Sequence, residues 1–253
     1  MTKAHNEVDY RKRDAVAIIT LNRPLKLNAM NSTMRNELID ALAKSESDGG
    51  VRVVILTGSG DKAFCAGRDL AEADVGQQED FLPMIGDRIK LRKPIIAAVN
   101  GLAYGAGWFL VQGCDLCVAS EDARFALPEA KVGRAPAWGC WLHGVVPQKI
   151  ALELLMTGNP ISAARAYEIG LINHVVPKEQ VMARAMRLAE DLIAAAPLSV
   201  LTSKEVTYRT IGLPRPAALQ LAFEIMAPIY VSEDAKEGVK AFREKRAPVW
   251  SGC

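Results

Sequence analysis

The sequence feature that most constrains the fold is an alternation of short apolar strands with amphipathic helices. The run AVAIITL at 15–21 and the run VRVVILTG at 51–58 are rich in β-branched residues, and each ends at a turn. Between them, 32–44 is predicted to form a helix, because its apolar residues recur on one helical face. These residues are Met34, Leu38, Ile39 and Leu42. Strand, helix and strand in this order predict a unit of a parallel sheet.

The same order of elements recurs further along the chain. A polar stretch with a helix through about residue 91 precedes a strand at 94–99, and another helix begins near Gly105. Short strands follow at 115–120 and 123–127. Only the order of elements repeats, and not the residues themselves. We therefore expect a series of right-handed crossover units.

From about residue 137 the chain is predicted to be mainly helical. The helices are expected at 141–158, 162–172, 178–196, 198–211, 216–230 and 232–246. The last of these carry wide apolar stripes, such as the one through Leu219 and Phe223. A stripe of this kind covers either the protein's own core or a neighbouring subunit, and the sequence leaves both open.

Charge and hydropathy argue against several classes of partner. The net charge is +2, and the basic clusters at 11–13 and 88–93 contain no aromatic residues, so we expect no nucleic-acid binding. The first residues lack the apolar segment of a signal peptide, which predicts a cytoplasmic protein. Although 94–119 contains no Lys or Arg, Asn100 and Gln112 interrupt it, so we expect no membrane span.

The cysteines and the common nucleotide and hydrolase motifs indicate no cofactor or metal. Five cysteines lack the spacing of a disulfide framework, and Cys114 and Cys117 lie in a predicted strand without a matching Cys or His pair. We expect packed thiols rather than a zinc or redox site. The chain contains no phosphate-binding loop of nucleoside triphosphatases, no G-x-S-x-G and no H-E-x-x-H.

Two glycine-containing loops stand at matching places, each after a predicted strand. Loop 62–70 follows the strand at 51–58, and loop 100–108 follows the strand at 94–99. Small residues there let a ligand approach backbone N–H groups at a helix N-terminus. Two such groups on one carbonyl oxygen would form an oxyanion hole, worth roughly 3 to 4 kcal/mol per donor. The alternative, two ordinary loops at strand ends, stays open.

Several motifs together resemble one known family. They are LNRPLKLNAMN, VVILTGSGDKAFCAGRDL, KPIIAAVNGLAYGAGWFLVQGCDLCVASEDARFALPEAKVG, TGNPISAARAYEIGLINHVV and SEDAKEGVKAFREKR. In order and spacing they are similar to the enoyl-CoA hydratase/isomerase (crotonase) family, and the similarity covers 8–250. The resemblance implies an α/β fold, a spiral of ββα units followed by helices that trimerise. It implies an acyl-CoA thioester substrate with no cofactor besides that coenzyme A.

The resemblance also implies an organisation of the chain and an assembly. A catalytic core is expected over 1–195, and a helical region for oligomerisation and CoA contact over 196–253. The expected assembly is a homotrimer or a dimer of trimers. The segment 71–87 is where members of the family vary and where acyl specificity usually resides, but no residue in it fixes an acyl length.

Matching positions assign roles to individual residues. The oxyanion donors are the backbone N–H groups of Arg68 and Ala106, and the catalytic carboxyl is Glu129. The Arg68 side chain has an alternative role at a CoA phosphate. The implied substrate- and CoA-binding positions are Lys26, Leu27, Asn28, Ala66, Asp69, Leu70, Phe109 and Lys245. Trp138 and Trp141 are expected to wall an acyl pocket, because tryptophan offers a large apolar face.

The number of carboxylates bears on the reaction. Hydratases of this family typically use two glutamates; Glu129 matches the second, but Phe109 stands at the first. Phenylalanine cannot move a proton, whereas a shift of a double bond needs only one carboxylate and an oxyanion hole. We therefore expect an isomerase with Glu129 as acid and base. A single-glutamate hydratase or hydratase-lyase, and a member that binds acyl-CoA without turnover, remain alternatives.

Two of these residues also have simpler explanations. Pro128 and Glu129 together fit the first turn of a helix, where proline and a carboxylate are both favourable. Taken alone, Lys245 would be a solvated charge near the end of a helix. The roles given to Glu129 and Lys245 therefore depend on the resemblance.

Overall fold

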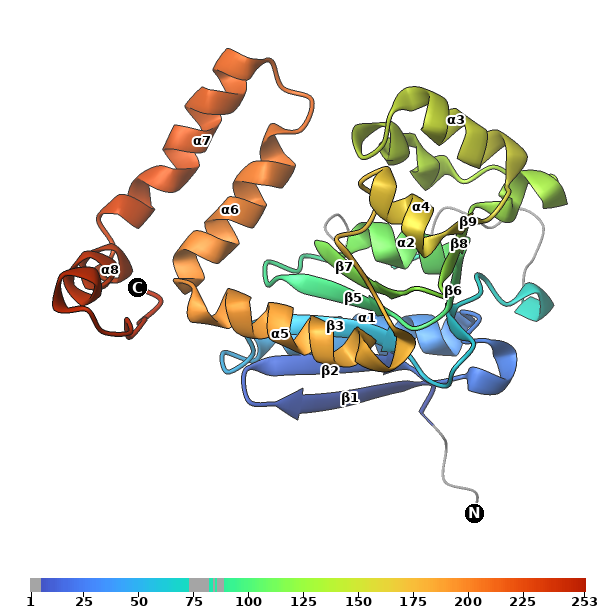
Figure 1. Ribbon diagram of the computed structural model, residues 1–253, viewed down its shortest axis with the longest axis horizontal. Helices are drawn as coiled ribbons and strands as arrows, with labels where there is room; N and C mark the ends of the chain where they lie inside the picture. The colour runs from blue at the N-terminus through green and yellow to red at the C-terminus, as the bar shows by residue number, and fades with distance from the viewer. Residues whose placement is uncertain (1–5, 73–81, 84, 86–88) are drawn as a thin grey trace.

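The computed structural model describes residues 6–72, 82–83, 85 and 89–253, and Figure 1 shows two layers of strands with helices around them. The strands are β1 Val8–Arg13, β2 Val16–Leu21, β3 Val53–Gly58, β4 Ala63–Cys65, β5 Ile95–Val99, β6 Leu102–Tyr104, β7 Leu116–Ser120, β8 Arg124–Ala126, β9 Ile161–Ser162 and β10 His174–Val176. The α-helices are α1 Ser32–Ser47, α2 Ala106–Gly113, α3 Gln148–Thr157, α4 Ala163–Glu168, α5 Val181–Ala194, α6 Pro197–Thr210, α7 Arg215–Tyr230 and α8 Glu233–Glu244. Short 3₁₀ helices are η1 Pro24–Lys26, η2 Leu70–Glu72, η3 Pro128–Val132, η4 Ala137–Gly144 and η5 Lys178–Gln180.

The larger sheet has the order β1-β2-β3-β5-β7-β10 in the described part of the chain. All neighbouring strands from β2 onwards are parallel, as the sequence predicts, and β1 pairs antiparallel with β2 at the edge. Strand β1 was not predicted, because half of it is the basic cluster Arg11, Lys12 and Arg13. Charged residues of this kind suit an edge strand, where they oppose pairing with another chain.

The smaller sheet has the order β4-β6-β8-β9. Strands β4, β6 and β8 are parallel, and β9 is antiparallel to β8. Each short strand follows a strand of the larger sheet, so β3–β4, β5–β6 and β7–β8 repeat one unit, and α2 completes the second of these units. The expected ββα spiral is therefore present.

Both faces of the larger sheet are covered. Helix α5 runs across one face (Figure 1) and buries Val181, Ala185 and Ala189 against β2, β3, β5 and β7. Helix α1 and the smaller sheet cover the other face, where Met34, Leu38 and Leu42 of α1 are buried. Every residue of β3 and β5 is buried. Continuous apolar runs of this kind are typical of parallel strands covered on both sides.

Two sequence predictions need correction, and part of one lies outside the described residues. The helix expected through residue 91 falls mostly on residues that are not described, and 89–91 are not helical. The helix expected at 141–158 is instead split into η4 and α3. Pro147 stands directly before α3, and proline cannot continue a preceding helix because it lacks an N–H donor.

The C-terminal helices form an arm beside the core. Helices α6 and α7 pack on each other as a hairpin, and α8 follows at the end of the arm (Figure 1). The tail then returns along α8, because the Asp234 carboxylate accepts hydrogen bonds from the N–H groups of Ser251 and Gly252. The indole of Trp250 donates to the carbonyl of Ala194 at 2.8 Å, which ties the tail to the end of α5. The predicted boundary at 195/196 falls between α5 and α6.

Candidate active site

Three loops carry the predicted catalytic groups, and the smaller sheet brings them together. Strands β4, β6 and β8 are neighbours and parallel. Their carboxyl ends therefore meet at one edge of the sheet. Arg68 lies three residues beyond β4, Ala106 lies two beyond β6, and Glu129 lies three beyond β8. Residues far apart in the sequence are placed side by side because each follows its strand by nearly the same distance.

The glycines of the first two loops allow close contact. Gly67 and Gly105 have φ angles of 116° and 49°, a region that side chains rarely permit. A Cβ atom added to Gly105 would lie 3.1 Å from Glu129 Oε1 and 3.8 Å from the Cα of Gly67. A Cβ added to Gly67 would lie 3.3 Å from the carbonyl oxygen of Tyr104. The two loops and the carboxyl group therefore form one cluster.

The backbone amide of Ala106 is placed to bind a ligand. Ala106 is the first residue of α2, so its N–H has no acceptor within the helix. In the part of the chain that the structure describes, no group accepts a hydrogen bond from it. The positive end of the helix dipole lies at the same point, which favours a developing negative charge.

The amide of Arg68 is oriented by its neighbours. Met30 N–H donates to the carbonyl of Gly67 at 2.8 Å, and Asp69 N–H donates to the carbonyl of Met30 at 2.8 Å. These two bonds make a parallel bridge between Met30 and Arg68. In such a bridge the N–H of Arg68, which lies between the two bonded residues Gly67 and Asp69, points away from the segment of Met30. The side chain of Arg68 donates to the carbonyl of Glu72 at 3.4 Å.

Glu129 is a half-buried carboxyl at the start of η3. Its Oε2 atom is buried and has no hydrogen-bond partner among the described residues. Burial raises the pKa of Glu129 above its usual range, because the charged carboxylate loses solvation. A carboxyl group with a raised pKa is suited to take up and return a proton near neutral pH.

Phe109 packs in an aromatic cluster. Its side chain is only 2% exposed, and its ring lies edge-on to Trp138 with centroids 5.2 Å apart. It stacks on Trp141 with centroids 6.5 Å apart. Phe109 lies about one turn after Gly105, the N-cap of α2. Gly105 in turn lies next to the Glu129 carboxyl group. An apolar aromatic surface therefore borders the cluster on the side of α2 and η4.

The predicted CoA-binding segments lie next to one another. Ala66 N–H donates to the carbonyl of Leu27 at 3.0 Å, so the loop after β4 runs beside the loop after β2. Lys26 is exposed, and Leu27 and Asn28 have left-handed backbones with φ angles of 51° and 54°. The fully buried side chain of Asn28 fixes this geometry, since its Nδ2 donates to the carbonyls of Ser59 and Ala63. Asn28 therefore shapes the loop from within.

Asp69 holds the same loops in place, and Leu70 is exposed. The Oδ2 atom of Asp69 accepts a hydrogen bond from Arg23 at 3.0 Å, and its Oδ1 atom accepts one from Ala71 N–H at 3.1 Å. The Ala71 N–H and then the Arg23 guanidinium lower the pKa of Asp69. Arg23 also bonds Glu7 and thereby links β1 to the loop. Leu70 begins η2 with its side chain 69% exposed.

Lys245 is not brought to this cluster within one chain. It follows α8 with an exposed side chain and a left-handed backbone. Helix α8 lies at the opposite end of the molecule from β6 and β8 (Figure 1). Within one chain, α8 and the strands that carry the cluster of Glu129 are therefore separated.

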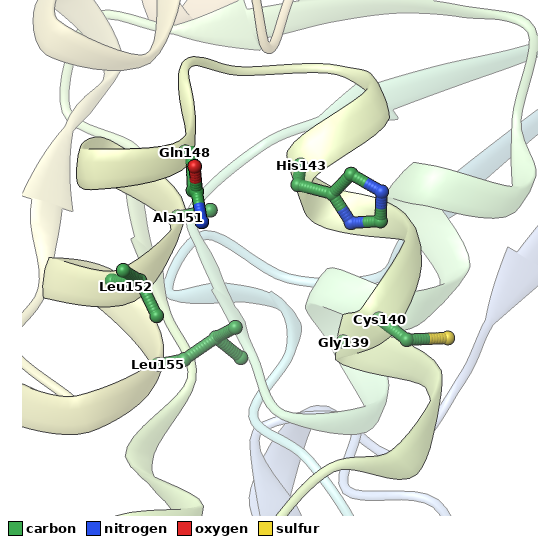
Figure 2. A pocket seen from close by; sticks show the side chains of 7 residues that line it. All are labelled: Gly139, Cys140, His143, Gln148, Ala151, Leu152 and Leu155. Atoms are coloured by element: carbon green, nitrogen blue, oxygen red, sulfur yellow. The ribbon is translucent and has the colours of Figure 1, made fainter.

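Two surface hollows lie elsewhere. One of about 590 Å³ lies between η4 and α3, and Figure 2 shows the side chains that line it. In this view Leu152 and Leu155 belong to α3, whereas the side chains of Cys140 and His143 point away from that helix. The second, of about 300 Å³, lies between the start of α6 and the tail and includes Arg52 and Trp250. Neither hollow includes Glu129, Arg68 or Ala106.

The described part of the chain contains neither a group of metal ligands nor a helix that could span a membrane. Among the described residues, no three His, Cys, Asp or Glu side chains are grouped as metal ligands. Over the same residues, no helix has the length and apolar character that crossing a bilayer requires. Cys114 and Cys117 are free, buried thiols.

The sequence alone did not identify Arg23 and Gln112 as functional candidates. Arg23 organises the loops through Glu7, Asp69 and the carbonyl of Ala29. Its position after a strand and before a proline was the one signal that the sequence offered. Gln112 stands in the sequence only as a polar interruption of an apolar stretch.

Comparisons with known proteins show the family to which the chain is similar. The family model described as enoyl-CoA hydratase/isomerase matches residues 11–253. A protein named "Enoyl-CoA hydratase EchA19" from Mycobacterium tuberculosis is 38% identical over 94% of this chain and 93% of its own length. A carnitinyl-CoA dehydratase from Salmonella typhi is 39% identical over 92% of this chain and 94% of its own length.

A solved structure gives the same result for the fold. The crystal structure of an enoyl-CoA hydratase from Bacillus anthracis has a TM-score of 0.90 and 32% identity, and the match covers 98% of this chain and 100% of that chain. These three relatives are named hydratases or a dehydratase, which gives no support to the preference for isomerisation. The family model, the identity with the relatives and the similarity of the fold together show that the chain belongs to the enoyl-CoA hydratase/isomerase family.

Proposed function

We propose that the protein adds water to, or removes it from, a 2-enoyl-CoA thioester, with Glu129 as the single acid and base. The observation that supports the proposal is the alignment of three parallel strand ends, after which Gly67 and Gly105, the residues before Arg68 and Ala106, lie close to each other, and Gly105 lies close to Glu129. The names of the relatives favour hydration over isomerisation.

The reaction follows from the groups in the cluster. The thioester oxygen accepts hydrogen bonds from the N–H groups of Arg68 and Ala106, which draw electrons from the double bond. The Glu129 carboxylate removes a proton from water while the oxygen of that water bonds to Cβ. The resulting enolate is stabilised by the two amides. Glu129 then returns the proton to Cα, so one carboxyl group moves the proton in both steps.

One observation favours a second function. Phe109 occupies the place where a second carboxyl group would help to orient water, and its ring is buried among aromatic side chains. A dry, apolar surface suits a shift of the double bond, in which Glu129 removes a proton from one carbon and returns it to another. Isomerisation of an enoyl-CoA is therefore the second candidate.

The proposal includes a CoA site and an assembly. The adjacent loops at Lys26, Leu27 and Ala66 are proposed to hold the adenine and phosphates. Helices α6 and α7 contain no buried residue, and Phe223 is 63% exposed. Apolar side chains on such a surface are covered when copies associate. We propose a trimer or a dimer of trimers, in which Lys245 of one copy approaches the CoA of another.

The first experiment separates the candidate functions. The protein is incubated with 2-enoyl-CoA and 3-enoyl-CoA thioesters, and mass and ultraviolet absorbance are followed. Hydration predicts a gain of one water, and isomerisation predicts conversion without a change in mass. Binding of both thioesters without either change would contradict both reactions and indicate a member that only binds acyl-CoA.

The Glu129→Gln variant tests the carboxyl group. We expect kcat to fall by about 100- to 10,000-fold, because the amide cannot transfer the proton. Glu121→Gln, at an exposed glutamate, is the matched control and is expected to keep full activity. Full turnover by Glu129→Gln would show that another group moves the proton.

A further inference from the structure

Helix α2 carries a second polar feature beyond the amide of Ala106. Both polar atoms of the Gln112 side chain, Oε1 and Nε2, are buried and have no hydrogen-bond partner in the described part of the chain. The Nε1–H of Trp108, four residues earlier, is buried in the same way, and Trp108 is only 1% exposed. Each buried polar group without a partner costs about 1 to 3 kcal/mol.

The position of Gln112 on the helix relates it to the catalytic cluster. Residues three apart on an α-helix differ by about 60° around its axis, so Gln112 lies beside Phe109 on α2, which begins at Ala106. Gly105 precedes the helix with a non-helical backbone, and a Cβ added there would lie 3.1 Å from Glu129 Oε1. Gln112 therefore neighbours the aromatic surface that Phe109 forms with Trp138.

The neighbourhood of Gln112 fits the far end of an acyl site. The next residue, Gly113, lies against Ile85, since a Cβ added there would be 3.3 Å from the Cβ of Ile85. An acyl chain that started at the amide of Ala106 and ran along α2 past the ring of Phe109 would reach the amide of Gln112 about 9 Å along the axis from Ala106.

We propose that Gln112 determines substrate specificity by binding a neutral polar group, such as a hydroxyl, at the far end of the acyl chain. The inference rests on the proposed function, because it assumes a thioester held at Ala106. A primary amide offers both a donor and an acceptor, and the indole of Trp108 adds a donor beside it. A hydroxyl group can donate to Oε1 and accept from either N–H. A methyl group at the same place would leave all three atoms without partners.

The test compares matched thioesters over a range of chain lengths. Each 2-enoyl-CoA is prepared with a methyl end and with an ω-hydroxyl end, and kcat/KM is measured for the pair. At the chain length that reaches Gln112, we expect the hydroxyl-ended substrate to be favoured by about ten- to a hundredfold. Equal values, or a preference for the methyl end at every length, would overturn the inference.

The matched variant is Gln112→Met, which keeps the length of the side chain and removes its hydrogen bonding. We expect the ratio of kcat/KM for the hydroxyl-ended substrate to that for the methyl-ended substrate to fall to about one. The unfolding temperature is expected to stay the same or to rise, because two buried atoms without partners are removed. A preference that survives in Gln112→Met would show that the amide does not bind the substrate.

A binding measurement separates this inference from the proposed reaction. Saturated acyl-CoA thioesters with and without the ω-hydroxyl group cannot be hydrated, and calorimetry gives their affinities directly. We expect wild-type protein to bind the hydroxyl-ended thioester about tenfold more tightly, and Gln112→Met to bind both equally. This difference in the absence of hydration would support the role of Gln112 and contradict only the reaction. Hydration without any difference in affinity or kcat/KM would contradict only the role of Gln112.

Discussion

The catalytic core and the C-terminal arm differ in how far their apolar side chains are buried. In the core, every residue of β3 and β5 is buried against other parts of the same chain. In the arm, no residue of α6 or α7 is buried, although α7 contains Leu219, Phe223 and Tyr230. The strands of the core are therefore covered within one chain, whereas the apolar side chains of the arm form an exposed surface that another copy can cover.

This difference separates the proposed chemistry from the proposed assembly. Arg68, Ala106 and Glu129 are positioned by strands of the core alone. Lys245 is the C-cap of α8, and α8 lies at the far end of the molecule from β6 and β8 (Figure 1). Changes in the core should therefore affect turnover at each site, and changes in the arm should affect association and the CoA affinity that depends on it.

Among the substitutions that compare the core with the arm, removal of an oxyanion donor in the core is expected to have the largest effect. Ala106→Pro deletes one N–H at the first position of α2, where helices tolerate proline and where the preceding residue is Gly105. We expect kcat to fall about 100- to 1,000-fold. Ala106→Ser, which keeps the N–H, is the control. Circular dichroism and sedimentation should show the wild-type fold and assembly for both variants.

The Ala106 comparison has a clear contrary result. If Ala106→Pro folds, assembles and retains wild-type turnover, the amide does not stabilise the enolate. If Ala106→Pro instead dissociated the protein, a change in the core would have altered the proposed association, and core and arm would not act separately. Turnover and sedimentation are therefore measured on the same preparation.

The arm is tested by placing charge on its apolar surface. Leu219→Glu with Phe223→Glu removes side chains that are 54% and 63% exposed in the protomer. We expect association to lose about 2 to 4 kcal/mol per copy, so the variant should sediment as a smaller species. Ala217→Glu, which adds a charge at an exposed position without removing a large apolar group, is expected to remain assembled. Unchanged sedimentation of the double variant would place the subunit contact elsewhere.

The junction between core and arm should show a smaller effect. Lys204 of α6 donates to Asp115 Oδ2 at 2.8 Å and to the carbonyl of Lys93 at 2.9 Å. Tyr208 donates to Asp115 Oδ1 at 2.9 Å. Lys204→Met leaves Asp115 without its cation, and we expect a loss of about 1 to 3 kcal/mol in unfolding free energy.

Denaturant unfolding at fixed protein concentration measures the effect of Lys204→Met. The control is Lys149→Met at an exposed position of α3, for which we expect no change in unfolding free energy. Destabilisation of the Lys204 variant should accompany weaker association, because α6 orients α7. A variant as stable as the control would mean that packing alone holds the arm to the core.

The sequence predicts the larger sheet well because burial on both faces leaves continuous apolar runs. It predicts the strand at 51–58 as β3 and the strand at 94–99 as β5, within two residues at each end. It does not predict β4 and β6 as strands, because each has three residues and lies inside a loop defined by its glycines. Such short strands are stabilised by pairing with residues distant in the sequence, which a local pattern cannot indicate.

The candidate site shows the same limit. The two glycine loops stand out in the sequence, and the residues alone indicate a pair of amide donors. The register that sets Glu129 beside Gly105 depends on the pairing of β6 with β8, so the carboxyl group was identified through the resemblance instead. The burial of the Gln112 amide likewise depends on the packing of α2 and has no local signal.

The smallest expected effect concerns the charge of Glu129, and it links the chemistry of the core to its stability. Burial raises the pKa of Glu129 in the folded protein above the value of about 4.3 expected when unfolded. The folded state therefore holds its proton to higher pH than the unfolded state. The stability associated with this proton is fully present below the unfolded pKa and is lost as pH rises through the folded pKa.

Glu129→Gln removes this dependence because the amide does not ionise. At neutral pH the variant should unfold at a slightly higher temperature than wild type, and the difference should vanish as the pH falls below about 4.3. In wild type, kcat/KM should rise with pH through the same raised pKa, since the carboxylate must be ionised to accept a proton from water. Scanning calorimetry and pH–rate profiles measure the two effects separately. A difference in unfolding temperature that grows on acidification would mean that the carboxylate is stabilised in the folded core, and the cluster would then lack the apolar character on which its role as a base depends.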